Sequence, residues 1–236
     1  MNARFAPLAL AFALIPFAAS AADVPTPSAA PTVAPSPNAA ESAFLTKVMR
    51  DLPQRYPNPA AANKAGYVRY SNEDATGAIS YVNTKAWNTT DPDVPAQLWY
   101  DVKGRLIGAD FSARRDPDAS PAPAPPSLFG IDPKRYGKVG AHVHYVTCNA
   151  MKKCAYGKAV GAKKYAAIGD VEHPTAEGLV KAGAVKDAAA VATVFLYPAI
   201  YDVSVWVVPN PLGQFADKNP AVIPSPRAGK GEDDAM

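Results

Sequence analysis

The chain has 236 residues, of which 48% are hydrophobic, and 24 lysines and arginines against 21 aspartates and glutamates give it a formal net charge of +3. This hydrophobic fraction excludes a fully disordered chain and, with 25 prolines, indicates a globular protein rich in loops. The charge is small and the basic residues are scattered, so nothing in the composition indicates nucleic-acid binding.

The first 22 residues have the pattern of a secretory signal peptide. Arg4 precedes an apolar run at residues 5–17, and the small residues 19–21 follow it. A run of about a dozen residues is shorter than the ~20 that span a bilayer. We therefore expect cleavage after Ala21 or Ala22, a secreted or periplasmic protein, and no transmembrane segment after signal cleavage. Loss of Arg4 lowers the net charge from +3 to +2.

Composition divides the rest of the chain into three parts. Residues 23–40 are almost entirely Pro, Ala, Ser and Thr, which predicts a disordered tether. Residues 41–215 are long enough for a single globular domain with its own core. Residues 216–236 resemble the tether in composition, and we expect them to form a flexible C-terminal tail.

Two helical segments open the predicted domain. Apolar residues at helical spacing predict a first helix that begins at Ser42 as N-cap and stops at Pro53. The second is a short helical turn with Asn58 as N-cap, Pro59 at its first position and Gly66 as its breaker. Both segments have the character of structural elements.

The following segments predict a mostly antiparallel sheet. We expect two strands around a turn at Gly77, a hairpin that turns at Lys103 and Gly104, and a proline-rich exposed loop at 114–130. A second hairpin at 138–148 and 154–160, short helices within 174–195 and a last strand from Asp202 complete the domain. The fold class is therefore α+β, a mostly antiparallel sheet flanked by an N-terminal helix and short late helices.

Cys148 and Cys154 are the two cysteines of the chain. In an oxidising compartment they are expected to form one disulfide, placed as a cross-strand staple at the base of the loop 149–153. A redox pair is the alternative, but the chain has no C-x-x-C motif.

Three histidines raise the hypothesis of a metal site. His142 and His144 alternate on one strand face, and His173 follows in a loop that could fold over that face. Together they suggest a divalent metal such as Zn or Cu, and with it a metal-dependent hydrolase or oxygenase. Simple hairpin register places Lys158 opposite His144, where a cation disfavours a metal. The alternative is a pair of histidines bonded to their neighbours.

The β region is also rich in aromatic residues. Four of them are candidates for lining a ligand-binding face: Trp99, Tyr145, Tyr156 and Trp206. The leading hypothesis is therefore non-enzymatic binding of a small ligand or an envelope component through this face, and a structural envelope interaction module is a further alternative. Aromatic residues on strands are, however, more often core.

Other catalytic patterns are weak. The chain has no G-x-S-x-G motif and no glycine-rich phosphate loop. Carboxylate pairs for glycoside hydrolysis can be drawn from Glu73, Asp74, Asp101 and Asp110, but the first two fall in a turn where acidic residues are common. Asn88 begins a glycosylation sequon whose use depends on the host.

Overall fold

The computed structural model describes residues 33–121 and 123–230. The predicted signal peptide, the first part of the tether and the last six residues of the predicted tail lie outside the described residues.

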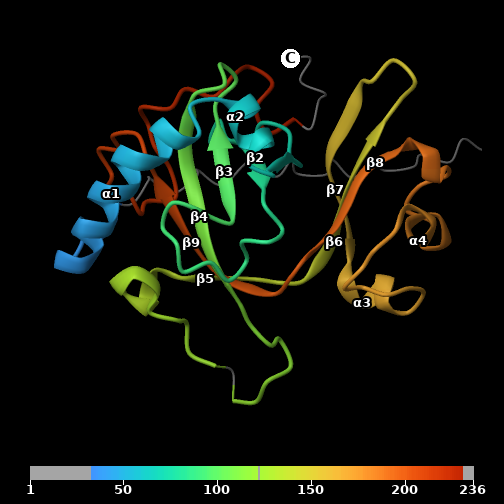
Figure 1. Cartoon of the computed structure of the whole chain (residues 1–236), viewed down its shortest axis with the longest axis horizontal. Coiled ribbons are helices and arrows are strands. Elements are labelled where there is room, and N and C mark those ends of the chain that lie inside the picture. The colour runs from blue at the N-terminus through green and yellow to red at the C-terminus, as the bar shows by residue number, and fades with distance from the viewer. Residues whose placement is uncertain (1–32, 122, 231–236) are drawn as a thin grey trace, which may run out of the picture. The chain divides into compact units, whose positions relative to one another are not determined.

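Two antiparallel sheets form the described part of the chain (Figure 1), which confirms the α+β class. The larger sheet has the order β1 (Val68–Arg69), β2 (Ile79–Val82), β3 (Gln97–Tyr100), β4 (Leu106–Arg114), β9 (Ile200–Trp206) and β5 (Gly137–Val139). The smaller sheet has the order β7 (Cys154–Gly161), β6 (His142–Cys148) and β8 (Val191–Tyr197). The α-helices are α1 (Ala39–Arg55), α2 (Pro59–Lys64), α3 (Ala162–Ala166) and α4 (Ala176–Lys181), with short 3-10 turns at Leu128–Gly130, Pro133–Arg135 and Ala188–Ala190.

Helix α1 covers one face of the larger sheet and builds the main core. Phe44, Leu45, Val48 and Leu52 of α1 pack in one cluster with apolar side chains of β2, β3, β4 and β9. The helix begins earlier than the sequence predicted, because Asn38 rather than Ser42 caps it. Asn38 and Glu41 form a capping box, in which each side chain accepts a hydrogen bond from the backbone N–H of the other.

Helix α1 also continues through the predicted stop. Pro53 lies inside its last turn, where a missing N–H costs only one helical hydrogen bond. Helix α2 follows the prediction closely, since Asn58 caps it, Pro59 starts it and Gly66 has a φ of +92° just after its end.

The opposite face of the larger sheet is turned toward the smaller sheet. Two connections carry the chain between the sheets: Gly140 and Ala141 join β5 to β6, and Pro198 and Ala199 join β8 to β9. At the other edge the backbone N–H of Gly157 donates to the Tyr70 carbonyl at 2.8 Å. The two sheets are thus linked at both edges, and side chains of both sheets pack between them.

The smaller sheet packs its other face on α3 and α4. Val143, Tyr145 and Val160 cluster there with Tyr165 and Leu179. The predicted helical region 174–195 is only partly helical: residues 176–181 form α4, whereas 191–197 form strand β8. The β-branched residues of that segment favour a strand, and pairing with β6 supplies its hydrogen bonds.

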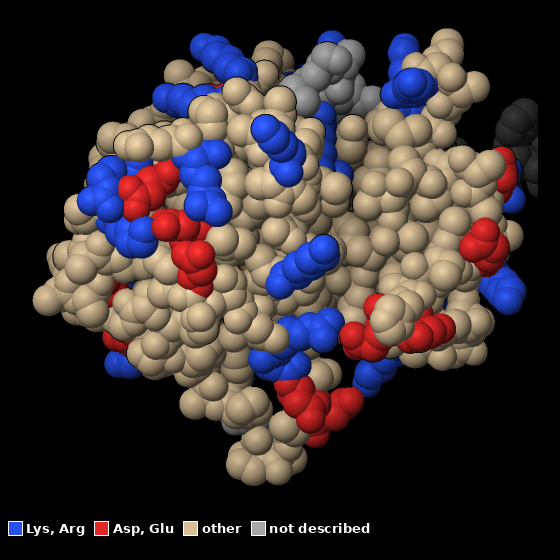
Figure 2. Space-filling model, in the orientation of Figure 1, with Lys and Arg blue, Asp and Glu red and all other residues tan. Residues whose placement is uncertain are grey.

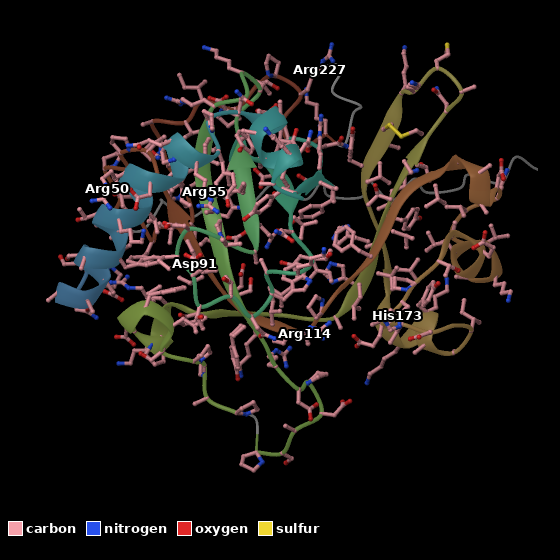
Figure 3. All side chains as sticks on the ribbon, viewed as in Figure 1. Arg50, Arg55, Asp91, Arg114, His173 and Arg227 are labelled. Atoms are coloured by element: carbon pink, nitrogen blue, oxygen red, sulfur yellow. A yellow bond between two sulfur atoms is a disulfide. The ribbon has the colours of Figure 1, made fainter. Side chains whose placement is uncertain are left out.

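The predicted disulfide is confirmed. Cys148 and Cys154 lie directly opposite each other across β6 and β7 and are bonded, as Figure 3 shows. A β-bulge between Tyr145 and Thr147 then shifts the register, so that Lys158 pairs with Tyr145 and Ala159 pairs with His144. The expected opposition of Lys158 and His144 is therefore wrong, because a bulge moves every later side chain to the other face.

Segments predicted as flexible make defined contacts near both ends of the described chain. In the predicted tether, the backbone N–H of Ala34 donates to the Leu212 carbonyl at 2.7 Å. In the predicted tail, Val222 is buried and the Ser225 N–H donates to the buried Glu73 carboxylate at 2.7 Å. No helix among the described residues combines the length and apolarity that crossing a bilayer requires.

Candidate functional site

A repeated Asp-x-Ser pattern lies on the paired strands β4 and β9 of the larger sheet. Strand β4 carries Asp110 and Ser112, and strand β9 carries Asp202 and Ser204. The antiparallel register places Asp110 opposite Ser204 and Ser112 opposite Asp202. The Ser204 hydroxyl donates to Asp110 Oδ1 at 2.7 Å, and the Ser112 hydroxyl donates to Asp202 Oδ1 at 2.5 Å. Each aspartate is therefore held by the serine of the other strand.

The two aspartates differ in how completely they are bonded. Asp110 is only 4% exposed and uses both carboxylate oxygens, since the Trp99 indole N–H donates to its Oδ2 at 2.8 Å. Asp202 is half-buried, and no described residue donates a hydrogen bond to its Oδ2. Asp202 therefore has an oxygen that can receive a donor or a positive charge.

Burial makes ionisation of both carboxylates costly. Desolvation raises the pKa of Asp202 to about 7, against a partly offsetting hydrogen bond from Ser112. Desolvation also raises the pKa of Asp110 well above its usual range, and the neighbouring charge of Asp202 adds to that effect. No lysine or arginine of the described chain forms an ion pair with either aspartate. The pair thus lacks the basic partner that buried carboxylates usually have.

Gly108 allows Trp99 to reach Asp110. These two residues are cross-strand neighbours on β3 and β4, and a Cβ on Gly108 would lie 2.2 Å from Cε3 of the indole. The ring therefore lies directly on the glycine backbone. Trp206 meets Trp99 edge to face, with ring centroids 5.5 Å apart.

Two tyrosines and a glutamine link the aspartate pair to the smaller sheet. Gln97, which pairs with Asp110 across the strands, accepts a hydrogen bond from the Tyr70 hydroxyl. Its amide nitrogen donates to the Tyr197 hydroxyl at 2.9 Å. Burial raises the pKa of both tyrosines, and the charges of Asp110 and Asp202 raise them further. Both phenols therefore stay neutral beside the carboxylates.

From the smaller sheet, His142 and His144 of β6 pack against the two tyrosines. Their ring centroids are 4.7 Å apart, and His142 stacks on Tyr197 at 4.7 Å. His144 meets Tyr70 edge to face at 4.9 Å, and its buried Nδ1 has no hydrogen-bond partner among the described residues. Desolvation, reinforced by His142, lowers the pKa of His144 to about 4. His144 is therefore neutral at neutral pH and packs as one more aromatic ring in this cluster.

His173 does not join these histidines. It is 86% exposed at its side chain and bonds Asp170 through Nδ1 at 2.9 Å. Within the described residues, no group of three or more His, Cys, Asp or Glu side chains is placed to hold a metal ion. The convergence that the metal hypothesis required is thus missing, because the loop of His173 folds back on its own acidic residue.

The four candidate aromatic residues do not form one face. Trp99 and Trp206 belong to one apolar cluster, whereas Tyr145 is buried in the core of the smaller sheet. Tyr156 is half-buried, with the Arg69 guanidinium 4.1 Å from its ring centroid. Of the four, Trp99 contacts the aspartate pair directly. The rings that cluster between the sheets are instead Tyr70, Tyr197 and the two histidines. Figure 3 shows side chains of both sheets filling the space between the ribbons.

Sequence reasoning weighed Asp110 but missed Asp202. The signal was present as two Asp-x-Ser triplets, each flanked by apolar residues, in "GADFSA" and "YDVSVW". The chain matches no protein-family model, and no curated protein or solved structure is significantly similar to it.

Proposed function

We propose that this protein is an exported, non-enzymatic binding domain that binds a small organic cation at Asp110 and Asp202, where the larger sheet faces the smaller one. The observation that carries the proposal is the pair Asp110 and Asp202, two interacting carboxylates that form no ion pair with a basic side chain among the described residues. A ligand that brings a positive charge supplies the missing partner. It also offsets the desolvation of the ionised pair.

Aromatic rings around the pair support a cation rather than a neutral ligand. The faces of tyrosine and tryptophan rings attract cations, and substituted ammonium groups suit such surroundings. Tyr70, Trp99 and Tyr197 each contact the aspartate pair or the glutamine beside it. A substituted ammonium group at the open oxygen of Asp202 therefore meets both charge and aromatic surface.

Export is supported by two separate features. The chain starts with the pattern of a signal peptide, and Cys148 and Cys154 form a disulfide of the kind that persists in oxidising compartments.

Choline and 3,3-dimethylbutan-1-ol provide a matched test, because the two molecules have nearly the same shape and differ in charge. We expect calorimetric titration to show saturable choline binding and at least about tenfold weaker binding of the neutral alcohol. Asp202→Asn should weaken choline binding by about tenfold or more, whereas Glu177→Gln on the exposed start of α4 should leave it unchanged. Equal binding of the two probes, or no saturable binding of either, would contradict the proposal.

A further inference from the structure

A hollow lies where the two sheets join, apart from the aspartate pair. It is a cavity of about 570 Å³ bounded by the end of β4, the loop that follows it, the two inter-sheet connections and α3. Figure 2 shows a hollow in the lower middle of the view, bordered by blue and red side chains. The volume falls within the range of small-molecule sites.

The floor of this cavity is apolar. Leu196 of β8, Pro198 and Ala199 of the β8–β9 connection, and Val171 line it. The backbone N–H of Arg115 donates to the Ala199 carbonyl at 2.9 Å and so holds the β8–β9 connection in place. The aliphatic chain of a ligand can therefore pack on an apolar surface whose backbone is held in place.

Basic side chains stand at the rim. Arg115 donates through Nη2 to the Val139 carbonyl at 3.3 Å, and its buried Nε has no acceptor among the described residues. Lys163 of α3 also lines the cavity, and no described carboxylate forms an ion pair with it. Arg115 and Lys163 both line the cavity, and a guanidinium together with an ammonium suits a carboxylate.

An ion pair at the edge of the cavity limits the negative charge that a bound ligand can carry. Arg114 and Glu172 meet at 3.2 Å across the boundary between this cavity and a smaller one of about 320 Å³ beside His173. Figure 3 labels Arg114 and His173, which both line the smaller cavity. Because Glu172 and Asp118 also line the main cavity, a second carboxylate on the ligand would be repelled.

From these contacts we propose that the junction cavity binds a small aliphatic monocarboxylate, with its carboxylate at Arg115 and Lys163 and its chain along Leu196 and Pro198. This site is separate from the proposed cation site at Asp110 and Asp202 and does not depend on it. The cavity joins elements from both sheets, so a bound acid would contact β4, β8 and α3 together.

Hexanoate and hexanamide are the probes that test this, since they share the chain and differ in the charged group. In a titration followed by amide chemical shifts, we expect hexanoate to bind with about millimolar affinity and to perturb Val171 and Ala199. Hexanamide should bind about tenfold more weakly. Equal affinity of the two probes, or shifts that do not saturate with hexanoate up to about 20 mM, would overturn the proposal.

Variants that remove single positive charges test where the carboxylate of hexanoate binds. Arg115→Gln should weaken hexanoate binding about tenfold and Lys163→Gln about threefold. Lys164→Gln is the matched control, because Lys164 is exposed on the same helix but does not line the cavity. If Arg115→Gln fails to fold, Lys163→Gln still decides: an effect no larger than that of Lys164→Gln would contradict the assignment.

Discussion

Asp110 on β4 and Asp202 on β9 are related by an exchange of partners, in which each carboxylate is bonded by the serine two residues away from the other. This arrangement fixes both side chains on one sheet face while leaving one oxygen of Asp202 open. The site is therefore rigid, and the negative charge of ionised Asp202 has no basic partner among the described residues.

Asp202 should make the protein less stable as the pH rises. Its folded-state pKa of about 7 lies above the ordinary aspartate value of 3.8, so the folded state holds more protons than the unfolded state between these pH values. The stabilising contribution is complete below about pH 4 and is lost as the pH rises through about 7. Asp202→Asn should therefore raise the free energy of unfolding at about pH 8 by about 2 kcal/mol.

Urea denaturation at about pH 5 and pH 8 measures this, with Glu177→Gln as the control. If Asp202→Asn is less stable than the parent protein at the higher pH, ionisation of Asp202 does not destabilise the folded state.

His144 should show the opposite dependence. Its pKa is lowered to about 4 by burial, so the unfolded state binds its proton first as the pH falls below about 6.5. The stability that neutral His144 contributes is present above that pH and is lost as the pH falls through about 4. Imidazole chemical shifts should locate its titration near pH 4 in the folded protein, and a midpoint near 6.5 would mean that the ring is solvated.

Gly108 should tolerate no side chain. In Gly108→Ala the new Cβ would collide with the Trp99 ring, so we expect a loss of about 3 kcal/mol and a red-shifted tryptophan emission. Gly161→Ala on β7 is the control, because its Cβ would meet nothing within 4 Å. Unchanged emission in Gly108→Ala would show that the indole does not depend on this contact.

The disulfide should contribute modestly, since it closes a short loop. Cys148→Ser with Cys154→Ser should lower the free energy of unfolding by about 2 kcal/mol and leave choline binding unchanged, because the staple lies at the hairpin end. Thiol titration of the denatured, unreduced protein should find no free thiol. Two equivalents would mean that the cysteines are reduced.

Local elements of this fold were predictable from sequence, and the site was not. The hairpin that turns at Lys103 and Gly104 follows from a few adjacent residues, because turn chemistry and strand alternation act locally. The pairing of Asp110 with Ser204 joins strands separated by many intervening elements, and nothing in either strand alone specifies that register. The bulge that moves Lys158 away from His144 is similarly decided by packing.

The histidines illustrate the same limit. Alternation along β6 predicted that His142 and His144 share a face, and their rings lie 4.7 Å apart. The position of His173 depends on the conformation of its loop, which the strand pattern does not predict. In the structure its ring is hydrogen-bonded to Asp170, three residues away. Strand β8 was missed because alanine-rich composition favours helix, whereas its β-branched residues and the open edge of β6 favoured a strand.

The pH dependence of choline binding tests the central claim most directly, because the charge of choline does not change with pH. A site that needs ionised Asp202 should bind choline about tenfold more tightly at about pH 8 than at about pH 6, and Asp202→Asn should abolish that difference. Calorimetric titration of the parent protein and the variant at both pH values gives the four affinities. A parent protein whose affinity is the same at both, or a variant that keeps the full dependence, would contradict the account of Asp110 and Asp202 as a cation site.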